Sequence, residues 1–443
     1  MSVRKTVLAA LGIGVVWQLT AWVVDDDQSV RWVLEKALKQ VLLRFAKSAE
    51  RVERRLAAVP KPVYDAGLPI SILDAMQAPP EGWACAPGRV DLMGSHTDYN
   101  LGHVLTMAID RDTVIAYTPR TDRMVHVASL NLPGESTFSL DDITHDPAVK
   151  WADYVRGVAD VFQNAGYALT GFNGLIHSTV PFGSGLSSSA AIEVATGVVF
   201  RRLGGWSMDG LTLAKLTQQA ENEFVGLACG ILDQYTSVHG REDHVLLLDC
   251  RSITSTVSAV DPSISVMICN TRAPRELTGS EYDDRRAQCE SGVATLKAFY
   301  PEIEALRDVS LEMLNAHRDQ VSDVVERRCR FIIEEDARVP ALAAALAAND
   351  RAGIRAITAA SFAGARDLYE ISVPAMEAMY DAMTGAPGAL GARQAGAGFG
   401  GCMVAFIEAG MEAAFSQHVM TAYEAQTGIT PEIYAVKPAA GAG

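Results

Sequence analysis

The sequence predicts an α+β fold with two domains, on three observations. Short β-favouring runs are mixed with runs of helical periodicity from residue 83 onward. The chain has 443 residues, which is long enough for two hydrophobic cores. The Asp261-Pro262 step separates this mixed region from one dominated by long, alanine-rich helices.

We therefore divide the chain into an amino-terminal segment (1–60), a first domain (61–262) and a second domain (263–443). The first domain is expected to contain strands at 104–109, 112–118 and 244–250 and helices at 190–203 and 211–226. The second is expected to contain a strand at 265–270, helices over 282–299 and 321–384, and a glycine-rich turn and strand over 391–407. Residues 438–443, PAAGAG, are expected to fray.

The amino-terminal segment differs in character from the rest. Residues 6–24 are nearly all apolar and have about the length that spans a bilayer. Residues 29–59 form a basic amphipathic pattern. Two interpretations stay open: a membrane span that keeps the body of the chain in the cytoplasm, or a buried helix of a soluble protein. We expect a cytoplasmic protein, with membrane association through residues 1–58 as the alternative.

Composition excludes several classes of protein. The formal net charge of −15, with no basic stripe in the body of the chain, argues against nucleic-acid binding. The seven cysteines are scattered, and no C-x-x-C pair occurs. A disulfide framework and a zinc site are therefore not indicated. The chain also lacks a P-loop, a G-x-S-x-G elbow and the protein-kinase signatures.

The segment PFGSGLSSSAA, residues 181–191, predicts a phosphate site. Gly183 and Gly185 allow a tight turn, including positive φ. Ser187 to Ser189 follow where a helix begins, so free N–H groups and the positive end of the helix dipole face outward. The alternative is an ordinary turn that caps a helix.

The segment APGRVDLMGSHTDYN, residues 86–100, predicts a site that binds several hydroxyl groups. It crowds donors and acceptors around two glycines, and these are Arg89, Asp91, His96, Asp98, Tyr99 and Asn100. Such a density suits a polyol, and Asp98 could accept from two vicinal hydroxyls. The alternative is a polar surface loop.

Asp233 is the third chemical signal, because it lies in the largely apolar segment 230–240. An ionised carboxylate there needs a partner, and Arg89 is the expected one. The alternative is a buried helix cap. Glu221 and Ser189 offer oxygen ligands for Mg²⁺. The glycine-rich segment 396–402 either approaches a ligand by its backbone or forms a tight hairpin.

Together these motifs resemble those of the galactokinases in the GHMP kinase family. GRVDLMGSHTDYN resembles the galactokinase signature, PFGSGLSSSAA the second GHMP kinase motif, and QAGAGFGGC (394–402) the third. The likeness runs from residue 83 to the carboxyl end. It implies a two-domain GHMP kinase fold: an α+β amino-terminal domain of the small-ribosomal-protein type, a carboxyl-terminal α/β sandwich, and an active site in the cleft between them.

The resemblance also implies ATP-dependent phosphorylation of the anomeric C1 hydroxyl of galactose. Asp233 becomes the base or orienting group, and Arg89 keeps it ionised and stabilises the transferring group. The implied sugar contacts are Ser95, His96, Asp98, Gly230, Asp233 and Tyr282. The implied ATP contacts are Pro181, Gly183, Ser184, Gly185, Leu186, Ser187, Ser188 and Ser189, with Trp151 and Tyr154 at the adenine. Ser189 and Glu221 are the implied Mg²⁺ ligands.

The chain departs from the signature at Ser95, where galactokinases have a glutamate that accepts from the sugar C6 hydroxyl. Losing such a charge-assisted bond, worth roughly 1.5–3 kcal/mol, changes sugar preference about tenfold or more. Arabinokinases have glycine and galacturonokinases alanine there, and Asp91 replaces a usual asparagine. Galactose is the expected substrate, with L-arabinose or D-galacturonate as alternatives. A catalytically inactive sugar-sensing regulator is an alternative of another class. We expect a monomer or weak dimer.

Overall fold

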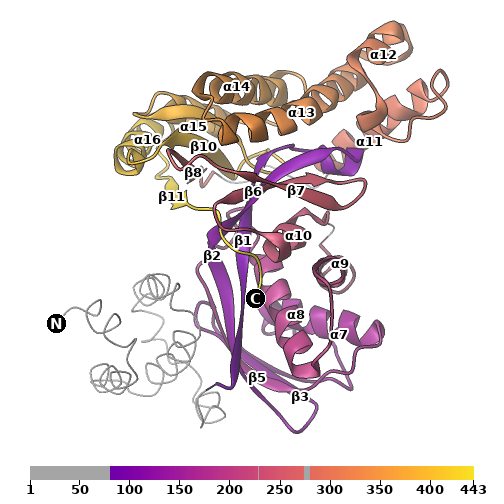
Figure 1. Ribbon diagram of the computed structural model, residues 1–443, viewed down its shortest axis with the longest axis vertical. Coiled ribbons are helices and arrows are strands. Elements are labelled where there is room, and N and C mark those ends of the chain that lie inside the picture. The colour runs from indigo at the N-terminus through magenta and orange to yellow at the C-terminus, as the bar shows by residue number, and fades with distance from the viewer. Residues whose placement is uncertain (1–79, 228, 274–279) are drawn as a thin grey trace.

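The computed structural model describes residues 80–227, 229–273 and 280–443 (Figure 1). The predictions for residues 6–24 and 29–59 therefore lie outside the described residues. Within these described ranges, no helix is both long enough and apolar enough to cross a bilayer.

The first part of the described chain forms a seven-stranded sheet in the order β4-β3-β5-β2-β6-β7, with β1 paired to β2. Neighbouring strands in this sheet pair antiparallel, except β3 and β5, which pair parallel. The strands are β1 (Gly82–Met93), β2 (His103–Pro119), β3 (Met124–Ser129), β4 (Glu135–Ser139), β5 (Phe172–Ser178), β6 (His244–Asp249) and β7 (Thr254–Ala259). The strands predicted at 104–109 and 112–118 are both parts of β2, because the polar residues between them continue the strand.

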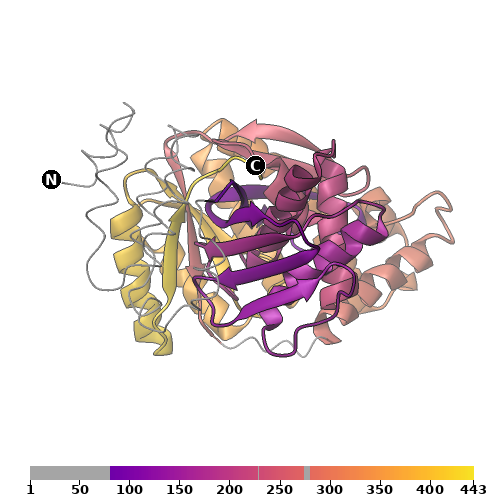
Figure 2. The same cartoon turned by 90° about the horizontal axis from the view of Figure 1, so that it is seen from below.

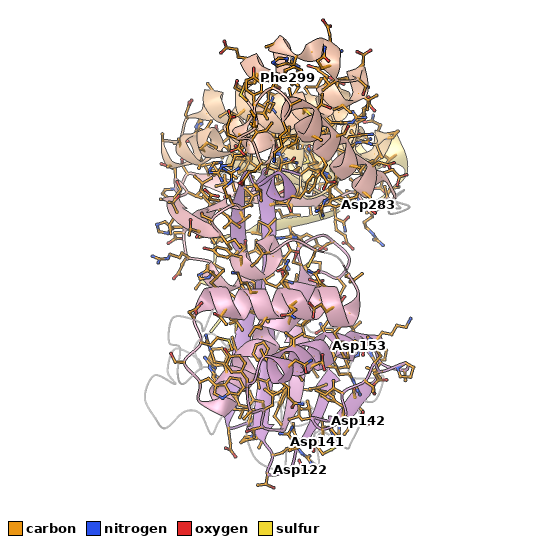
Figure 3. All side chains as sticks on the ribbon, turned by 90° about the vertical axis from the view of Figure 1, so that its right-hand side faces the viewer. Asp122, Asp141, Asp142, Asp153, Asp283 and Phe299 are labelled. Atoms are coloured by element: carbon orange, nitrogen blue, oxygen red, sulfur yellow. The ribbon has the colours of Figure 1, made fainter. Side chains whose placement is uncertain are left out.

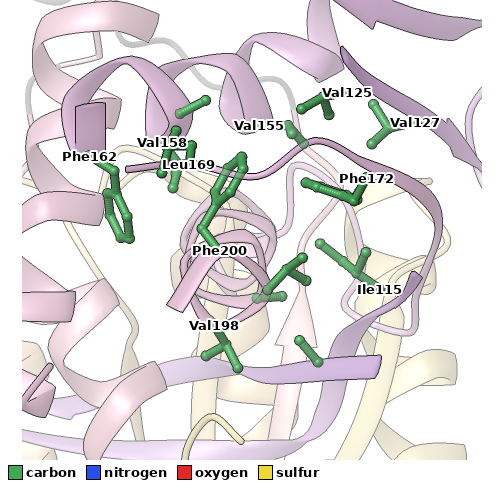
Figure 4. Close-up of a cluster of buried hydrophobic side chains, with 14 of the residues drawn as sticks. Ile115, Val125, Val127, Val155, Val158, Phe162, Leu169, Phe172, Val198 and Phe200 are labelled. Atoms are coloured by element: carbon green, nitrogen blue, oxygen red, sulfur yellow. The ribbon is translucent and has the colours of Figure 1, made fainter. Parts of the chain in front are cut away.

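Helices gather against this sheet, as the view from below shows (Figure 2). They are α7 (Asp153–Asn164), α8 (Ser188–Gly204), α9 (Gly210–Gln219) and α10 (Leu232–His239), with a π-helical turn at Ala220–Val225. Apolar side chains from α7, α8 and strands β2, β3 and β5 fill the space between, including Ile115, Phe162, Phe172 and Phe200 (Figure 4). This core fixes α8, whose first turn carries the serines of the phosphate motif.

The second part forms a four-stranded sheet in the order β11-β8-β10-β9. Its strands are β8 (Ile264–Asn270), β9 (Ala389–Gln394), β10 (Cys402–Glu408) and β11 (Glu432–Val436). Its helices are α11 (Ser280–Leu296), α12 (Leu311–Ala316), α13 (Asp323–Ala347), α14 (Arg351–Asp367), α15 (Pro374–Thr384) and α16 (Glu412–Thr427). The change of sheet falls between β7 and β8.

A second apolar core joins the two sheets. Leu92 and Leu105 of the β1–β2 hairpin lie in the same buried cluster as Leu342 of α13 and Phe406 of β10. The hairpin therefore reaches from the first sheet into the second part of the molecule (Figure 1). Labelled acids stand at the lower end and along one side, among them Asp122, Asp141 and Asp283 (Figure 3).

The carboxyl-terminal tail does not fray, so that prediction is wrong. From β11 it crosses back to the first sheet, where the N–H of Ala439 donates to the carbonyl of Ala108 at 2.9 Å. Gly443 exchanges two backbone hydrogen bonds of 2.9 Å with Cys85 of β1. The small residues that suggested disorder are the ones that fit this narrow course, and Ala439 is buried.

Candidate active site

Arg89 and Asp233 form the ion pair that the sequence predicted. Arg89 follows a bulge in β1, between Pro87 and Arg89, and Asp233 is the second residue of α10. The Arg89 Nε and Nη2 atoms lie 2.6 and 2.5 Å from Asp233 Oδ1. The side chains are only 11% and 19% exposed, so the pair is partly shielded from solvent.

The glycine-serine loop is tied to this pair by two contacts. Arg89 Nη1 donates to the carbonyl of Gly185 at 2.6 Å. The hydroxyl of Ser187 donates to Asp233 Oδ2, so both carboxylate oxygens are engaged. The second contact was not predicted, because a serine at a helix start gives no signal of a partner 46 residues away.

The loop has the backbone that its glycines predicted. Gly183 and Gly185 have φ of 67° and 79°, and Ser187, the residue before α8, also lies in the left-handed region with φ of 57°. The side chains of Ser184 and Leu186 are buried and do not face solvent. The Ser184 hydroxyl donates to the carbonyl of Pro181 at 2.8 Å. These two side chains therefore support the loop from behind.

A pocket joins the predicted adenine residues to the serines. Trp151 and Tyr154 line it together with Ser188 and Ser189 at the start of α8. Its empty volume is about 470 Å³, which includes space open to solvent. The predicted aromatic residues and two of the four predicted serines, Ser188 and Ser189, thus line one pocket. Phe182 of the loop, 51% exposed, also lines it and was not predicted.

Glu221 lies in the π-helical turn, and a second buried acid, Glu193, lies in α8. Both accept a hydrogen bond from the same side-chain amide, that of Gln234. The Nε2 atom of Gln234 donates to Glu221 Oε2 at 2.7 Å and to Glu193 Oε2 at 2.9 Å. Glu193 Oε1 and Gln234 Oε1 are buried without a hydrogen-bond partner. Burial raises the pKa of Glu193 well above its ordinary value, and the nearby Glu221 raises it further.

Glu193 and Gln234 are residues that sequence reasoning missed. Glu193 stands four residues after Ser189, one helical turn along the same face, and Gln234 follows Asp233. A glutamate inside an otherwise apolar helical run was the available signal. Within the described residues, no group of three or more histidine, cysteine, aspartate or glutamate side chains is arranged to hold a metal. The oxygen atoms that meet in this cluster belong to Glu193, Glu221 and the amide of Gln234.

The predicted sugar residues also come together. Gly230 lies beside Asp98, since a Cβ on Gly230 would stand 2.9 Å from Asp98 Oδ2. The rings of His96 and Tyr282 have centroids 5.2 Å apart. Burial raises the pKa of Asp98 to about 6, and the charges of Asp91 and Asp233 add to this effect. Asp98 and Asp233 therefore lie close enough to interact.

Burial lowers the pKa of His96 to about 4, so its ring is neutral at physiological pH. Its Nε2 atom lies 2.9 Å from the carbonyl of Ala397, which can only accept, so this nitrogen carries the proton. Its Nδ1 atom, 2.9 Å from the Tyr99 hydroxyl, then accepts. Both nitrogens are thus held by protein groups, and His96 presents the face of its ring.

Ser95 is buried and faces a charged cluster. Its hydroxyl accepts from Arg393 Nη2 of β9 at 2.8 Å, and the same nitrogen pairs with Glu335 Oε1 of α13 at 3.0 Å. The Oδ2 atom of Asp91 lies 3.5 Å from the Ser95 hydroxyl oxygen, and the Oδ1 atom of Asp91 is buried without a hydrogen-bond partner. Burial raises the pKa of Asp91, although Arg393 and Arg89 act against that shift.

Three family models match the chain. The galactokinase galactose-binding signature matches residues 74–119, the amino-terminal domain of GHMP kinases matches 153–241, and the carboxyl-terminal domain of GHMP kinases matches 342–423. A galactokinase of Roseiflexus sp. (strain RS-1) is 42% identical over 358 residues, which covers 81% of this chain and 91% of that protein. The chain belongs to the galactokinase family. Its use of ATP follows from that membership.

Solved structures agree with the family. A crystal structure of Lactococcus lactis galactokinase complexed with galactose has a TM-score of 0.78 and 30% identity, covering 84% of this chain and 98% of that one. Mevalonate kinase of Methanococcus jannaschii, at 17% identity and a TM-score of 0.55, covers 81% of this chain and 98% of its own and shares the fold. The predicted two-domain GHMP kinase fold and galactokinase assignment are confirmed.

Proposed function

We propose that the chain transfers the terminal phosphoryl group of ATP to the C1 hydroxyl of galactose at the Arg89–Asp233 pair. The observation that carries this proposal is the pair's position against the glycine-serine loop, through Gly185 and Ser187. Asp233 accepts the proton of the C1 hydroxyl or orients that hydroxyl for attack. Arg89 stabilises the negative charge of the transferring group, at a site where partial burial strengthens its effect.

We place ATP along the pocket lined by Trp151, Tyr154 and Ser189. Its base would lie between the aromatic side chains, and its phosphates would approach the N–H groups at the start of α8. The proposed loop contacts are Pro181, Gly183, Gly185, Ser187 and Ser188, with Ser184 and Leu186 supporting them. This placement brings the phosphate end of the nucleotide toward the loop that contacts Asp233.

We propose that Ser189 and Glu221 would hold Mg²⁺, with Glu193 as an additional acceptor. The unpartnered Glu193 Oε1 is the observation that supports a cation here, because a buried acceptor needs a donor or a metal. When bound, the ion would neutralise charge on the phosphates. Gln234 holds the two acids in position by donating to both.

We propose a neutral, galacto-configured sugar as the acceptor. Asp98 accepts from sugar hydroxyls beside Gly230, while His96 and Tyr282 supply ring surface. Near Ser95, the positive charge of Arg393 is already balanced by Glu335, and Asp91 is a second buried acid there. A uronate carboxylate there would meet repulsion, so galactose is favoured over galacturonate. L-Arabinose remains the second candidate, because Ser95 is engaged by Arg393.

The test is a panel of galactose, L-arabinose, galacturonate, 6-deoxygalactose and N-acetylgalactosamine, with ADP formation and phosphorus NMR of the product. Galactose should give the highest kcat/KM and a sugar 1-phosphate. If L-arabinose is turned over faster than galactose, arabinose is the substrate. If galacturonate is turned over faster than galactose, the argument that buried acids near Ser95 repel a uronate is refuted. Sugar binding without turnover of any panel member would identify a sugar-sensing regulator.

We propose 61–262 as the ATP- and sugar-binding domain and 263–443 as the carboxyl-terminal domain, with the site at their junction. The location is proposed to be cytoplasmic, in a monomer or weak dimer. A chain lacking residues 1–60 should retain its kinase activity, and fractionation of the full chain without detergent would show whether those residues attach it to membranes.

A further inference from the structure

We propose that the carboxyl-terminal tail, residues 438–443, is a strap that sets the position of Asp233 relative to Arg89. The tail leaves β11 of the second sheet and ends against β1 of the first (Figure 1). It contacts both elements that carry the catalytic pair. This inference rests on the proposed function, because it assigns the pair its catalytic role.

The tail binds the carboxyl end of α10. The N–H of Ala442 donates to the carbonyl of Ser237 at 2.9 Å, and the N–H of Gly441 donates to the carbonyl of Gly240 at 2.6 Å. The last carbonyls of a helix have no partner within it, so these bonds satisfy groups that would otherwise need water. The tail therefore acts as a cap supplied from the far end of the chain.

The same end of α10 is bonded to β1. The Ser237 hydroxyl donates to the carbonyl of Pro87 at 2.7 Å, and Gly443 pairs with Cys85 two residues earlier in β1. Ser237 stands one helical turn after Asp233, while Pro87 stands two residues before Arg89. Helix α10 and strand β1 are therefore joined at two places. At one place the tail bonds to both elements, and at the other Arg89 pairs with Asp233.

The fit of the tail depends on Gly441. A Cβ on Gly441 would lie 2.1 Å from the carbonyl oxygen of Val238, which is backbone and cannot rotate away. A Cβ on Gly443 would meet nothing within 4 Å. The neighbouring glycines thus give a matched pair of substitutions, Gly441→Ala and Gly443→Ala. Each adds one methyl group, and only the first forces the tail away from α10.

The experiment compares these two variants with the wild-type chain in steady-state kinetics and in hydrogen exchange. Gly441→Ala should lower kcat about tenfold, because small displacements of reacting groups slow catalysis strongly. KM for ATP should stay within about twofold, since the pocket lined by Trp151 and Tyr154 includes no residue of the tail. Amides of α10 should exchange faster in Gly441→Ala, whereas amides of α7 and all those of Gly443→Ala should match the wild type.

A double variant separates the strap from a purely structural role of the tail. If the strap positions Asp233, the loss of kcat caused by Gly441→Ala should disappear in an Asp233→Asn background, because the positioned group is then already removed. Equal kcat for the two glycine variants, or an undiminished tenfold loss in the Asp233→Asn background, would overturn the strap. Absence of sugar phosphorylation by the wild type would refute the proposed function instead, and the exchange of α10 would still report whether the tail holds that helix.

Discussion

Asp233 and the Glu193–Glu221 pair are neighbouring carboxylate sites near the first two turns of α8, and they differ in what balances their charge. Asp233 has Arg89 on one oxygen and the Ser187 hydroxyl on the other. Both glutamates accept from the amide of Gln234, and among the described residues neither forms a salt bridge. The first site is balanced by the protein alone. The second needs a proton or a metal cation.

Because their charges are balanced differently, we infer that the two sites have separate roles in catalysis. A carboxylate fixed by a guanidinium is ready to accept or orient a proton without binding a metal. Two acids in a buried place, one with an unpartnered oxygen, favour the arrival of a cation. Removing one acid from each site should therefore affect different steps of the reaction.

The largest effect is expected for Asp233→Asn. The amide keeps the size of the side chain and removes the proton acceptor, so kcat should fall by a factor on the order of 10²–10⁴. Binding of ATP should be little changed, because the adenine and serine contacts remain. Turnover close to that of the wild type would show that Asp233 is not the acceptor. Thermal unfolding of the variant controls for loss of the fold.

Glu221→Gln should give the next effect, and it should depend on Mg²⁺. The amide is a weaker ligand than the carboxylate, so the Mg²⁺ concentration for half-maximal rate should rise about tenfold or more. Excess Mg²⁺ should restore part of kcat. Asp141→Asn, at an exposed acid that pairs with Arg123 at the protein surface, is the matched control and should leave the Mg²⁺ dependence unchanged.

The pH dependence of sugar use should follow Asp98. Burial raises its pKa to about 6, so the carboxylate is the acceptor above that pH and is lost as pH falls below it. The kcat/KM for galactose should drop about tenfold for each further unit of pH below 6. His96 stays neutral across this range because its pKa is about 4. A profile that is flat between pH 5 and 7 would contradict an ionised Asp98 in sugar binding.

The smallest effect is expected at Ser95. Ser95→Glu places a carboxylate beside Arg393 and should raise the galactose-to-arabinose ratio of kcat/KM by up to about tenfold. Ser95→Gln, of the same size and uncharged, should change the ratio less. The added acid joins Asp91 and Glu335 in a buried place, so a lower Tm should accompany it. An unchanged ratio would show that position 95 does not set sugar preference.

The sequence predicted the residues whose chemistry demands a partner. Asp233 was found because an acid in an apolar segment needs a cation, and Arg89 is that cation. The glycines at 183 and 185 were found because their positive φ is a local property of the chain. The two-domain fold followed from the mixture of short strands and long helices and from the family motifs.

Several contacts between residues that are distant in the sequence were not predicted. Gln234 bridges Glu193 and Glu221, which are 28 positions apart, and no local pattern marks that meeting. Arg393 reaches Ser95 from 298 positions away. The tail looked disordered because small residues bury little surface, yet their size is what lets backbone approach backbone at Gly441.

The most direct test of the central claim is calorimetric titration of MgATP into the wild type, Asp233→Asn and Glu221→Gln. If the two carboxylate sites have separate duties, Asp233→Asn should bind MgATP with the wild-type affinity, and Glu221→Gln should bind it more weakly while binding metal-free ATP unchanged. Weaker MgATP binding by Asp233→Asn together with normal binding by Glu221→Gln would contradict the account.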